Sequence, residues 1–374
     1  MTKNNPRRVL ITGASGFIGK NLGFRLSEHP NTELLEFIRG DSIEMLNHLV
    51  MQADAIIHLA GENRPSNISD FTTTNIDLTS HLCKAIKESG RNIPMIFTSS
   101  TQAEDDNLYG KSKLTAEQLI KSFVNETQNS VLIYRLPGVF GKWSKPNYNS
   151  VVATFCFNIA RSLEIHVSDE STTLDLVYID DLVDDLLTDL TKINPGLSWG
   201  NLTTTYNISL GELAAQIFAF RDSRFNLISE RVGNGLVGAL YSTFVSFLPT
   251  ESFCYDLPNY ADERGNFVEF LKTKDSGQFS FLTINPGITR GSHYHHSKTE
   301  KFIVVQGKAR LRFRHLVTKE IHEINLSDAK SQIVDTIPGW VHDVTNIGST
   351  DVVILLWANE NFDREYPDTI AEEV

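Results

Sequence analysis

Short apolar runs alternate with stretches of helical periodicity over the first two-thirds of the chain. The runs expected to form strands are Arg8 to Thr12, Leu34 to Ile38, Ala55 to Leu59, Ile93 to Thr98 and Val131 to Leu136. The expected helices are Phe17 to Ser27, Asp41 to Val50, Phe71 to Ser89 and Tyr109 to Asn125. Strands that alternate with helices build a parallel sheet covered by helices. The pattern therefore predicts an α/β domain with a doubly wound, Rossmann-like parallel sheet.

After about Pro249 the pattern changes to short alternating stretches punctuated by glycine and proline. Examples are Phe302 to Val305, Ala309 to Phe313 and Val352 to Trp357. This texture favours an all-β domain. A chain of 374 residues is long enough for two domains. We expect the first over residues 1–248 and the second over residues 249–374.

Composition narrows the class of function. The chain has 34 basic and 46 acidic side chains, and its net charge of −12 argues against nucleic acid or an anionic membrane surface as a partner. No export signal or membrane-spanning run is evident. Cys83, Cys156 and Cys254 lie far apart in the sequence, so we expect reduced, buried thiols rather than a disulfide framework. A soluble cytoplasmic protein is the expectation.

The segment after the first strand favours a bound dinucleotide. It reads Gly13-Ala14-Ser15-Gly16-Phe17-Ile18-Gly19 and opens a helix. Glycines at this spacing allow a tight turn, a close approach of a pyrophosphate to the backbone amides, and close packing of the helix on the sheet. The alternative is a plain tight turn, which the strand before and the helix after make less favourable.

The end of the second strand suggests which dinucleotide binds. Arg39 stands where an NAD enzyme would place a carboxylate for the ribose hydroxyls, and a guanidinium suits a 2′-phosphate. The alternative is a solvated arginine beside Asp41. NADP is favoured over NAD.

Tyr109 and Lys113 are candidates for proton transfer. On a helix they stand one turn apart on one face, where an ammonium can help to depress the pKa of the phenol. A tyrosine so placed can exchange a proton with a carbonyl oxygen. Ser100 ends the preceding strand, at the edge where ligands bind in open α/β sheets. A Tyr/Lys pair at this spacing, taken on its own, commonly occurs on a protein surface by chance and has no function.

Together these motifs resemble the extended short-chain dehydrogenase/reductase family that acts on nucleotide sugars. The motifs are the glycine segment, His58-Leu59-Ala60-Gly61, Thr98-Ser99-Ser100, the Tyr109/Lys113 pair, and Arg135-Leu136-Pro137 followed by Val139-Phe140-Gly141. The resemblance implies that Ser100 bonds the reacting oxygen, Tyr109 donates the proton, and Lys113 binds the nicotinamide ribose. It also implies that Leu59 and Ala60 contact the cofactor. Gly138 departs from the family, which often has asparagine there.

The loop at residues 141–150 combines cations, aromatic rings and amides. The candidates for binding a nucleoside diphosphate are Lys142, Trp143, Lys145, Asn147, Tyr148 and Asn149. A lysine can pair with phosphate, and an aromatic ring can stack on uracil. The alternative is a solvated loop.

Four side chains that can bind a metal occur in the β half at intervals typical of a metal site. They are His293, His295, Glu300 and His342. His293 and His295 share one face of a strand, and a turn brings Glu300 back on the neighbouring strand. Three imidazoles and a carboxylate suit Zn²⁺, Mn²⁺, Fe²⁺ or Ni²⁺, and we expect Zn²⁺. The spacing resembles both cupin motifs, which implies a double-stranded β-helix barrel; the second motif is altered, because Gly339 follows Pro338 directly.

A reductase joined to a metal cupin resembles the bifunctional UDP-2-acetamido-2,6-dideoxy-β-L-arabino-4-hexulose reductases of UDP-N-acetyl-L-fucosamine synthesis. The resemblance implies that the cupin epimerises C3 of a UDP-4-keto sugar and that the reductase domain then reduces C4 with NADPH, for capsule or O-antigen synthesis. A homodimer is expected by analogy. One alternative is an epimerase or dehydratase that recycles bound NAD and has a structural cupin. Another is a non-enzymatic NADP sensor.

Overall fold

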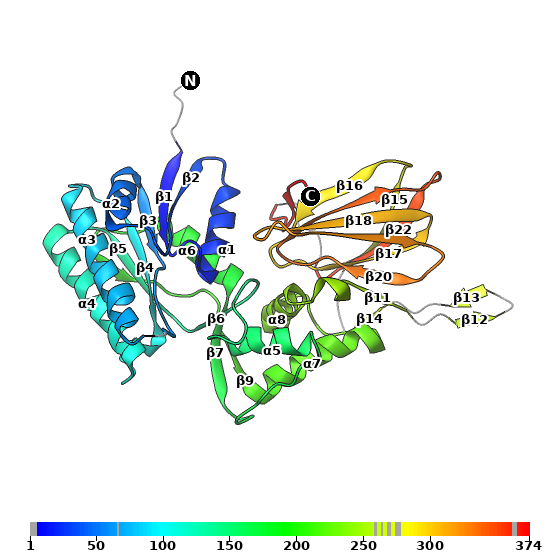
Figure 1. Cartoon of the computed structure of the whole chain (residues 1–374), viewed down its shortest axis with the longest axis horizontal. Coiled ribbons are helices and arrows are strands. Elements are labelled where there is room, and N and C mark those ends of the chain that lie inside the picture. Colours follow the sequence, from blue (N-terminus) through cyan, green and yellow to red (C-terminus); the bar gives the residue numbers. More distant parts are fainter. Residues whose placement is uncertain are drawn as a thin grey trace, which may run out of the picture. The chain divides into compact units, whose positions relative to one another are not determined.

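The computed structural model describes residues 6–65, 67–257, 260–262, 265–267, 271–273, 278–360 and 365–374. The chain forms two compact units (Figure 1). The first comprises Met1–Val139 and Asp175–Asn207, and the second comprises Phe140–Leu174 and Ile208–Val374. The expected domain boundary at residue 248 stays a prediction.

A six-stranded parallel sheet in the order β2-β1-β3-β4-β5-β8 forms the centre of the first unit. Its strands are β1 (Arg7–Thr12), β2 (Thr32–Phe37), β3 (Ala55–His58), β4 (Met95–Ser100), β5 (Val131–Leu136) and β8 (Leu197–Trp199). The chain runs outward from β1 to β2 and then returns to β3 on the other side of β1. This reversal confirms the predicted doubly wound sheet, and ligands bind such sheets at the carboxyl ends of the strands beside the reversal.

Helices cover both faces of this sheet. The helices α2 (Ile43–Gln52), α3 (Leu78–Glu88) and α4 (Leu108–Thr127) lie on one side, and α1 (Phe17–Ser27) and α6 (Ile179–Leu190) lie on the other (Figure 1). The predicted helix at residues 71–89 is divided into a π-helical turn, Phe71–Asp77, and α3. Fully buried apolar side chains, among them Leu10, Ile56, Leu82 and Ile120, join the sheet to α2, α3 and α4.

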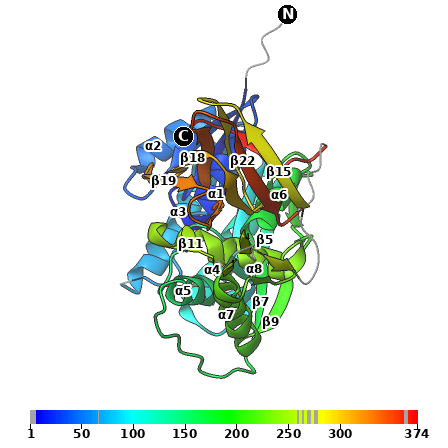
Figure 2. The same cartoon turned by 90° about the vertical axis from the view of Figure 1, so that its right-hand side faces the viewer.

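The second unit contains a helical part and a β part. Helices α5 (Val151–Ile159), α7 (Leu210–Asn226) and α8 (Gly235–Ser246) pack against one another (Figure 2). The β part has two five-stranded antiparallel sheets, in the orders β11-β20-β17-β22-β15 and β19-β18-β21-β16-β23. Their strands are β11 (Cys254–Asp256), β15 (Gln278–Ile284), β16 (Thr289–Tyr294), β17 (Glu300–Gln306), β18 (Lys308–His315), β19 (Ile321–Ser327), β20 (Gln332–Asp335), β21 (Trp340–Asn346), β22 (Val352–Ala358) and β23 (Ile370–Ala371). The predicted all-β domain is confirmed.

The remaining elements are short. The strands β6 (Gly138–Phe140), β7 (Thr173–Tyr178) and β9 (Tyr206–Ser209) form a small sheet. Two pairs of short strands are β10 (Ile228–Ser229) with β14 (Lys272–Thr273), and β12 (Tyr260–Asp262) with β13 (Gly265–Phe267). Two 3₁₀ turns span Thr101–Glu104 and Thr250–Ser252. No helix within the described ranges is long and apolar enough to cross a membrane.

All three cysteines are free thiols, as predicted. Cys83 and Cys156 are buried, but Cys254 is only partly buried, so the prediction of burial is wrong for that residue. The reason is its place on β11, which is an edge strand of its sheet.

Candidate functional site

The glycine segment lies at the reversal of the parallel sheet. Gly13 leaves β1 with a φ of +74°, and a Cβ on it would come within 2.9 Å of the Ala60 backbone. A Cβ on Gly19 would collide with the carbonyl oxygen of Gly13. Only glycine fits either position, because the turn, the start of α1 and the end of β3 approach so closely. The N-terminus of α1, which begins at Phe17, is thereby placed where it can face an anion.

The structure brings the predicted cofactor residues of this segment together. Gly13, Ser15 and Gly16 form the turn, Phe17, Ile18 and Gly19 form the first turn of α1, and Leu59 and Ala60 follow β3. Their contact with a cofactor stays a prediction.

A chain of hydrogen bonds, which the sequence did not reveal, joins β1 to β3. The Ala60 amide donates to Thr12 Oγ1 over 3.3 Å, and Thr12 Oγ1 lies 2.6 Å from Nδ1 of His58. On the other side of the ring, Nε2 lies 2.9 Å from Thr79 Oγ1, which donates to the Asn75 carbonyl. The two threonines therefore assign the His58 proton to Nε2. Burial lowers the pKa of His58 to about 3, so the ring stays neutral and fixes the backbone beside the glycine turn.

Arg39 has an acidic partner next to the candidate cofactor site. Its guanidinium is 81% exposed and donates to Glu62 Oε2 over 2.6 Å. Glu62 is held in turn, because its amide donates to Oδ1 of the buried Asn75 and its carbonyl accepts from Nδ2 of Asn75. A 2′-phosphate that bound Arg39 would therefore compete with a fixed carboxylate.

Two local features place Tyr109 in the first turn of α4. The side chain of Asn107 accepts from the Gly110 amide over 2.7 Å and caps the helix. A Cβ on Gly110 would collide with the carbonyl oxygen of Gln102, so glycine lets the helix start against the turn that follows β4. The result places Tyr109 beside Ser100, the last residue of β4.

The phenol of Tyr109 stays protonated in the structure. The sequence predicts a depressed pKa for Tyr109, but in the structure the pKa is raised, because burial disfavours the phenolate more than the nearby Ser100 hydroxyl favours it. Tyr109 therefore keeps its proton near neutral pH, as a proton donor requires.

Lys113 is buried on the same helix. Its Nζ donates to the Thr98 carbonyl over 3.0 Å and lies 5.2 Å from the centre of the Phe97 ring. Burial lowers the pKa of Lys113 to about 8, while the Glu117 carboxylate acts in the opposite direction. The ammonium also lies 3.0 Å from the position that a Cβ on Gly61 would take. The motif glycine after β3 thus leaves room for Lys113.

Arg135, the first residue of the Arg135-Leu136-Pro137 motif, contacts the helix that carries the Tyr/Lys pair. From β5 it donates through Nε and Nη2 to the two oxygens of Glu117, over 2.9 and 2.8 Å. Glu117 is one turn beyond Lys113 on α4. The pair anchors the helix that carries Tyr109 to the sheet.

Gly138 lies in a tight space. A Cβ there would meet Leu176 Cδ2 at 3.0 Å and the Asp175 carbonyl at 3.2 Å. The close strand β7 therefore favours glycine where the resembling family often has asparagine.

The loop at residues 141–150 has both buried and exposed members. Lys142 is only 2% exposed, with Nζ 5.6 Å from the centre of the Trp143 ring. Lys145 is exposed, with Nζ 4.8 Å from the centre of the Tyr148 ring. Asn147 and Asn149 are exposed as well. The role of all six predicted residues in substrate binding stays a prediction.

The four predicted metal ligands of the second unit converge. One ligand atom from each of His293, His295, Glu300 and His342 lies within 4.8 Å of the others. His293 and His342 are register partners on β16 and β21. Two details differ from the sequence prediction: β16 ends at Tyr294, so His295 lies just beyond the strand, and β17, which starts at Glu300, belongs to the other sheet.

The site has the features of a cation centre. Both ring nitrogens of His342 are buried without a hydrogen-bond partner in the described part of the chain, and Nε2 lies 3.7 Å from Glu300 Oε2. Burial alone would raise the pKa of Glu300, but the imidazoles of His295 and His342 and the Lys298 ammonium hold it well below its usual value. Burial lowers the pKa of His293 to about 4, which keeps its ring neutral. Neutral imidazoles around a carboxylate fit a divalent metal ion.

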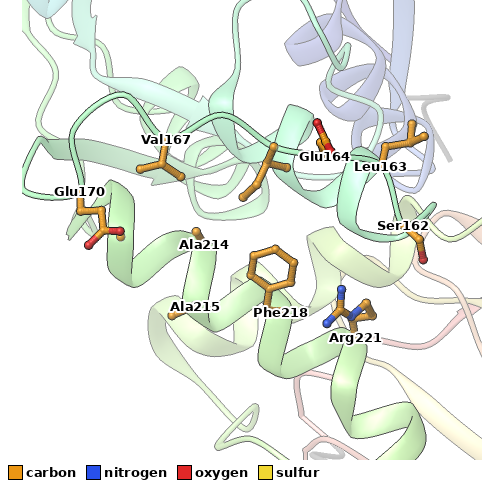
Figure 3. Close-up of a pocket in the computed structure, with 11 residues that line it drawn as sticks. Ser162, Leu163, Glu164, Val167, Glu170, Ala214, Ala215, Phe218 and Arg221 are labelled. Carbon is orange, nitrogen blue, oxygen red and sulfur yellow. The ribbon is translucent and has the colours of Figure 1, made fainter.

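A cavity of about 650 Å³ lies elsewhere in the second unit. Figure 3 shows Ala214, Phe218 and Arg221 on α7 facing the segment that carries Leu163 and Glu164. None of the predicted catalytic, cofactor, substrate or metal residues lines it.

Comparison with known proteins defines the class. The chain belongs to the NAD dependent epimerase/dehydratase family, whose pattern matches residues 9–209. Residues 260–370 match the polysaccharide biosynthesis C-terminal domain.

Relatives share the arrangement of both halves. Over 365 residues, 97% of this chain and 98% of the relative, the sequence is 51% identical to UDP-2-acetamido-2,6-beta-L-arabino-hexul-4-ose reductase of Pseudomonas aeruginosa. The crystal structure of the capsular polysaccharide assembling protein CapF from Staphylococcus aureus matches with a TM-score of 0.66 and 40% identity, over 98% of this chain and 100% of that one. MoeE5 in complex with UDP-glucose and NAD, at 20% identity and a TM-score of 0.54 over 64% of this chain and 98% of that one, shares the fold alone.

Proposed function

We propose that this chain reduces the C4 ketone of a UDP-4-keto-6-deoxy-N-acetylhexosamine with NADPH. A metal-assisted epimerisation at C3 in the β part precedes the reduction, and the product is UDP-N-acetyl-6-deoxy-L-talosamine for capsule or O-antigen synthesis. The 51% identity to a UDP-hexulose reductase over nearly the whole chain supports the substrate class.

The reductase chemistry rests on three side chains of the first unit. Reduced nicotinamide supplies the hydride to C4. Tyr109 donates its proton to the ketone oxygen, and Ser100, which lies beside the phenol, holds that oxygen in line. Lys113 supplies positive charge behind the phenol and binds the nicotinamide ribose. Tyr109 and Lys113 together on α4, beside Ser100 at the end of β4, are the observation that carries the proposal.

The epimerase chemistry rests on the four ligands of the second unit. When bound, a divalent cation would polarise the C4 carbonyl and acidify the hydrogen at C3. His293, His295, Glu300 and His342 would hold the cation, and we take Zn²⁺, which accepts imidazole and carboxylate ligands, as the ion.

A time course with purified protein, NADPH and the UDP-4-keto sugar tests the proposal. We expect one NADPH to be oxidised for each sugar reduced. An enzyme that recycled tightly bound NAD would instead form product without net NADPH oxidation, and that result would overturn the proposal. A sensor would bind NADPH with no turnover at all.

A further inference from the structure

The C-terminal segment of the second unit lies directly against the metal-ligand cluster. Its strand β23 pairs with β16, where Ala371 is the register partner of the ligand His293. The Glu372 amide donates to the Ser292 carbonyl over 2.9 Å, and its carboxylate accepts from Arg314 on β18 over 2.7 Å. The segment is therefore fixed to β16 and β18, two strands of one sheet, just beside the cluster.

Asp368 begins this contact with its main chain. Its carbonyl oxygen is hydrogen-bonded to Nδ1 of the ligand His295. A carbonyl can only accept, so Nδ1 must carry the proton. The lone pair with which the ring can bind a metal is then on Nε2, which lies 3.3 Å from Glu300 Oε2. A ring nitrogen and a carboxylate oxygen at this distance need a proton or a cation between them.

The side chain of Asp368 holds the turn that carries His295. Its Oδ1 accepts from the His296 amide over 2.8 Å, and its Oδ2 accepts from the amides of Ser297 and Lys298, each over 2.8 Å, and from the Ser297 hydroxyl over 3.0 Å. Four donors aimed at one carboxylate form a built anion site. The turn between two metal ligands is thus tied to a residue from the far end of the chain.

We infer that Asp368 is a positioning residue of the metal centre: its carbonyl fixes His295 as the Nδ1–H tautomer, and its carboxylate fixes the turn that aims Nε2 at the ion. The inference rests on the proposed metal centre. Partners of this kind orient a ligand and raise its basicity, and their loss weakens metal binding about 10- to 100-fold.

Cobalt titration of the metal-free protein tests the inference. Co²⁺ binding is followed by its visible absorption in the wild type, Asp368→Ala, Asp368→Asn and the control Glu373→Ala, which removes an exposed carboxylate of the same segment. We expect about 10- to 100-fold weaker binding and an altered spectrum for Asp368→Ala, partial rescue by Asp368→Asn, whose amide oxygen can still accept, and a change of less than about twofold for the control.

Long-range ¹H–¹⁵N spectra of the metal-free wild type, labelled at histidine, give an independent readout that does not depend on folding of a variant. His295, assigned by His295→Gln, should be protonated at Nδ1. Equal Co²⁺ affinity in Asp368→Ala and the wild type, or an Nε2–H tautomer in the wild type, would overturn the inference. A wild type that bound no Co²⁺ at all would overturn the metal centre itself.

Discussion

The indole of Trp143 lies against the backbone of Gly339, the residue that interrupts the second cupin motif. Gly339 has a φ of +82°, and a Cβ on it would come within 2.8 Å of Trp143 Cζ2. The amide of Gly339 also donates to the carbonyl of the ligand His295 over 3.1 Å. The altered motif thus makes room for a tryptophan of the loop at residues 141–150, next to the metal-ligand turn.

Replacing Gly339 by alanine should destabilise the second unit. The positive φ alone costs about 1–3 kcal/mol for a residue with a Cβ, and the collision with Trp143 adds to it. Gly287→Ala is the matched control, because Gly287 has a φ of +75° and open space around it. Urea unfolding should show a larger loss for Gly339→Ala, partly relieved when Trp143→Ala is added. Equal losses for the two glycines would contradict the contact.

Lys113→Met should abolish reduction yet raise the stability of the protein at pH 7. The pKa of about 8 in the folded protein lies below the ordinary lysine value of 10.5, so folding disfavours the charged amine. The advantage of the variant over the wild type is complete below pH 8. It shrinks as pH rises from 8 to 10.5, because folded Lys113 loses its proton in this range while the unfolded chain still holds it. The difference in the free energy of unfolding between the two proteins changes by a total on the order of 2–4 kcal/mol.

Unfolding midpoints of both proteins across this pH range measure the effect. Lys121→Met, at an exposed position on the same helix, should show no such dependence. A constant difference between Lys113→Met and the wild type from pH 7 to 10 would contradict the burial of a charged amine.

Arg39 and Glu62 should control cofactor preference in opposite directions. Arg39→Ala removes the proposed partner of the 2′-phosphate, so NADPH affinity should fall about 10- to 100-fold with little change for NADH. Glu62→Gln weakens the 2.6 Å pair that occupies the guanidinium, so NADPH should bind more tightly. Calorimetric titration with both cofactors decides the matter. An equal loss of affinity for NADPH and for NADH in Arg39→Ala would contradict the role of Arg39 as the partner of the 2′-phosphate.

His293→Ala should separate the two proposed activities. Loss of a ligand should abolish solvent deuterium incorporation at C3, while reduction of a pre-epimerised sugar continues. His322→Ala is the control, since His322 lies in the same unit outside the metal-ligand cluster. Mass spectrometry of the recovered sugar measures the exchange. Undiminished incorporation in metal-free protein would contradict a metal-dependent epimerase.

The sequence predicted what local spacing determines. Strand–glycine–helix order placed Gly13 to Gly19, helical spacing put Tyr109 and Lys113 on one helix, and two short motifs brought His293, His295, Glu300 and His342 into one cluster. Each of these patterns lies within a few residues or follows a regular period, so it can be recognised without knowledge of the fold.

Contacts between distant segments could not be predicted in this way. The ring of His58 is held by Thr12 and Thr79, 46 and 21 residues away, and neither threonine belongs to one of the motifs. Asp368 reaches His295 across 73 residues. The pKa of Tyr109 is raised and not depressed as the Tyr/Lys spacing predicts, because burial, which depends on tertiary packing, has the largest effect on it.

The central claim is that Tyr109 gives its proton to the ketone. The turnover of NADPH and UDP-4-keto sugar by Tyr109→Phe, measured beside NADPH binding and beside Tyr366→Phe at an exposed site, tests it most directly. The account predicts a turnover about 10²- to 10⁴-fold below the wild type, with NADPH affinity retained and Tyr366→Phe unaffected. Reduction by Tyr109→Phe at the wild-type rate would contradict it.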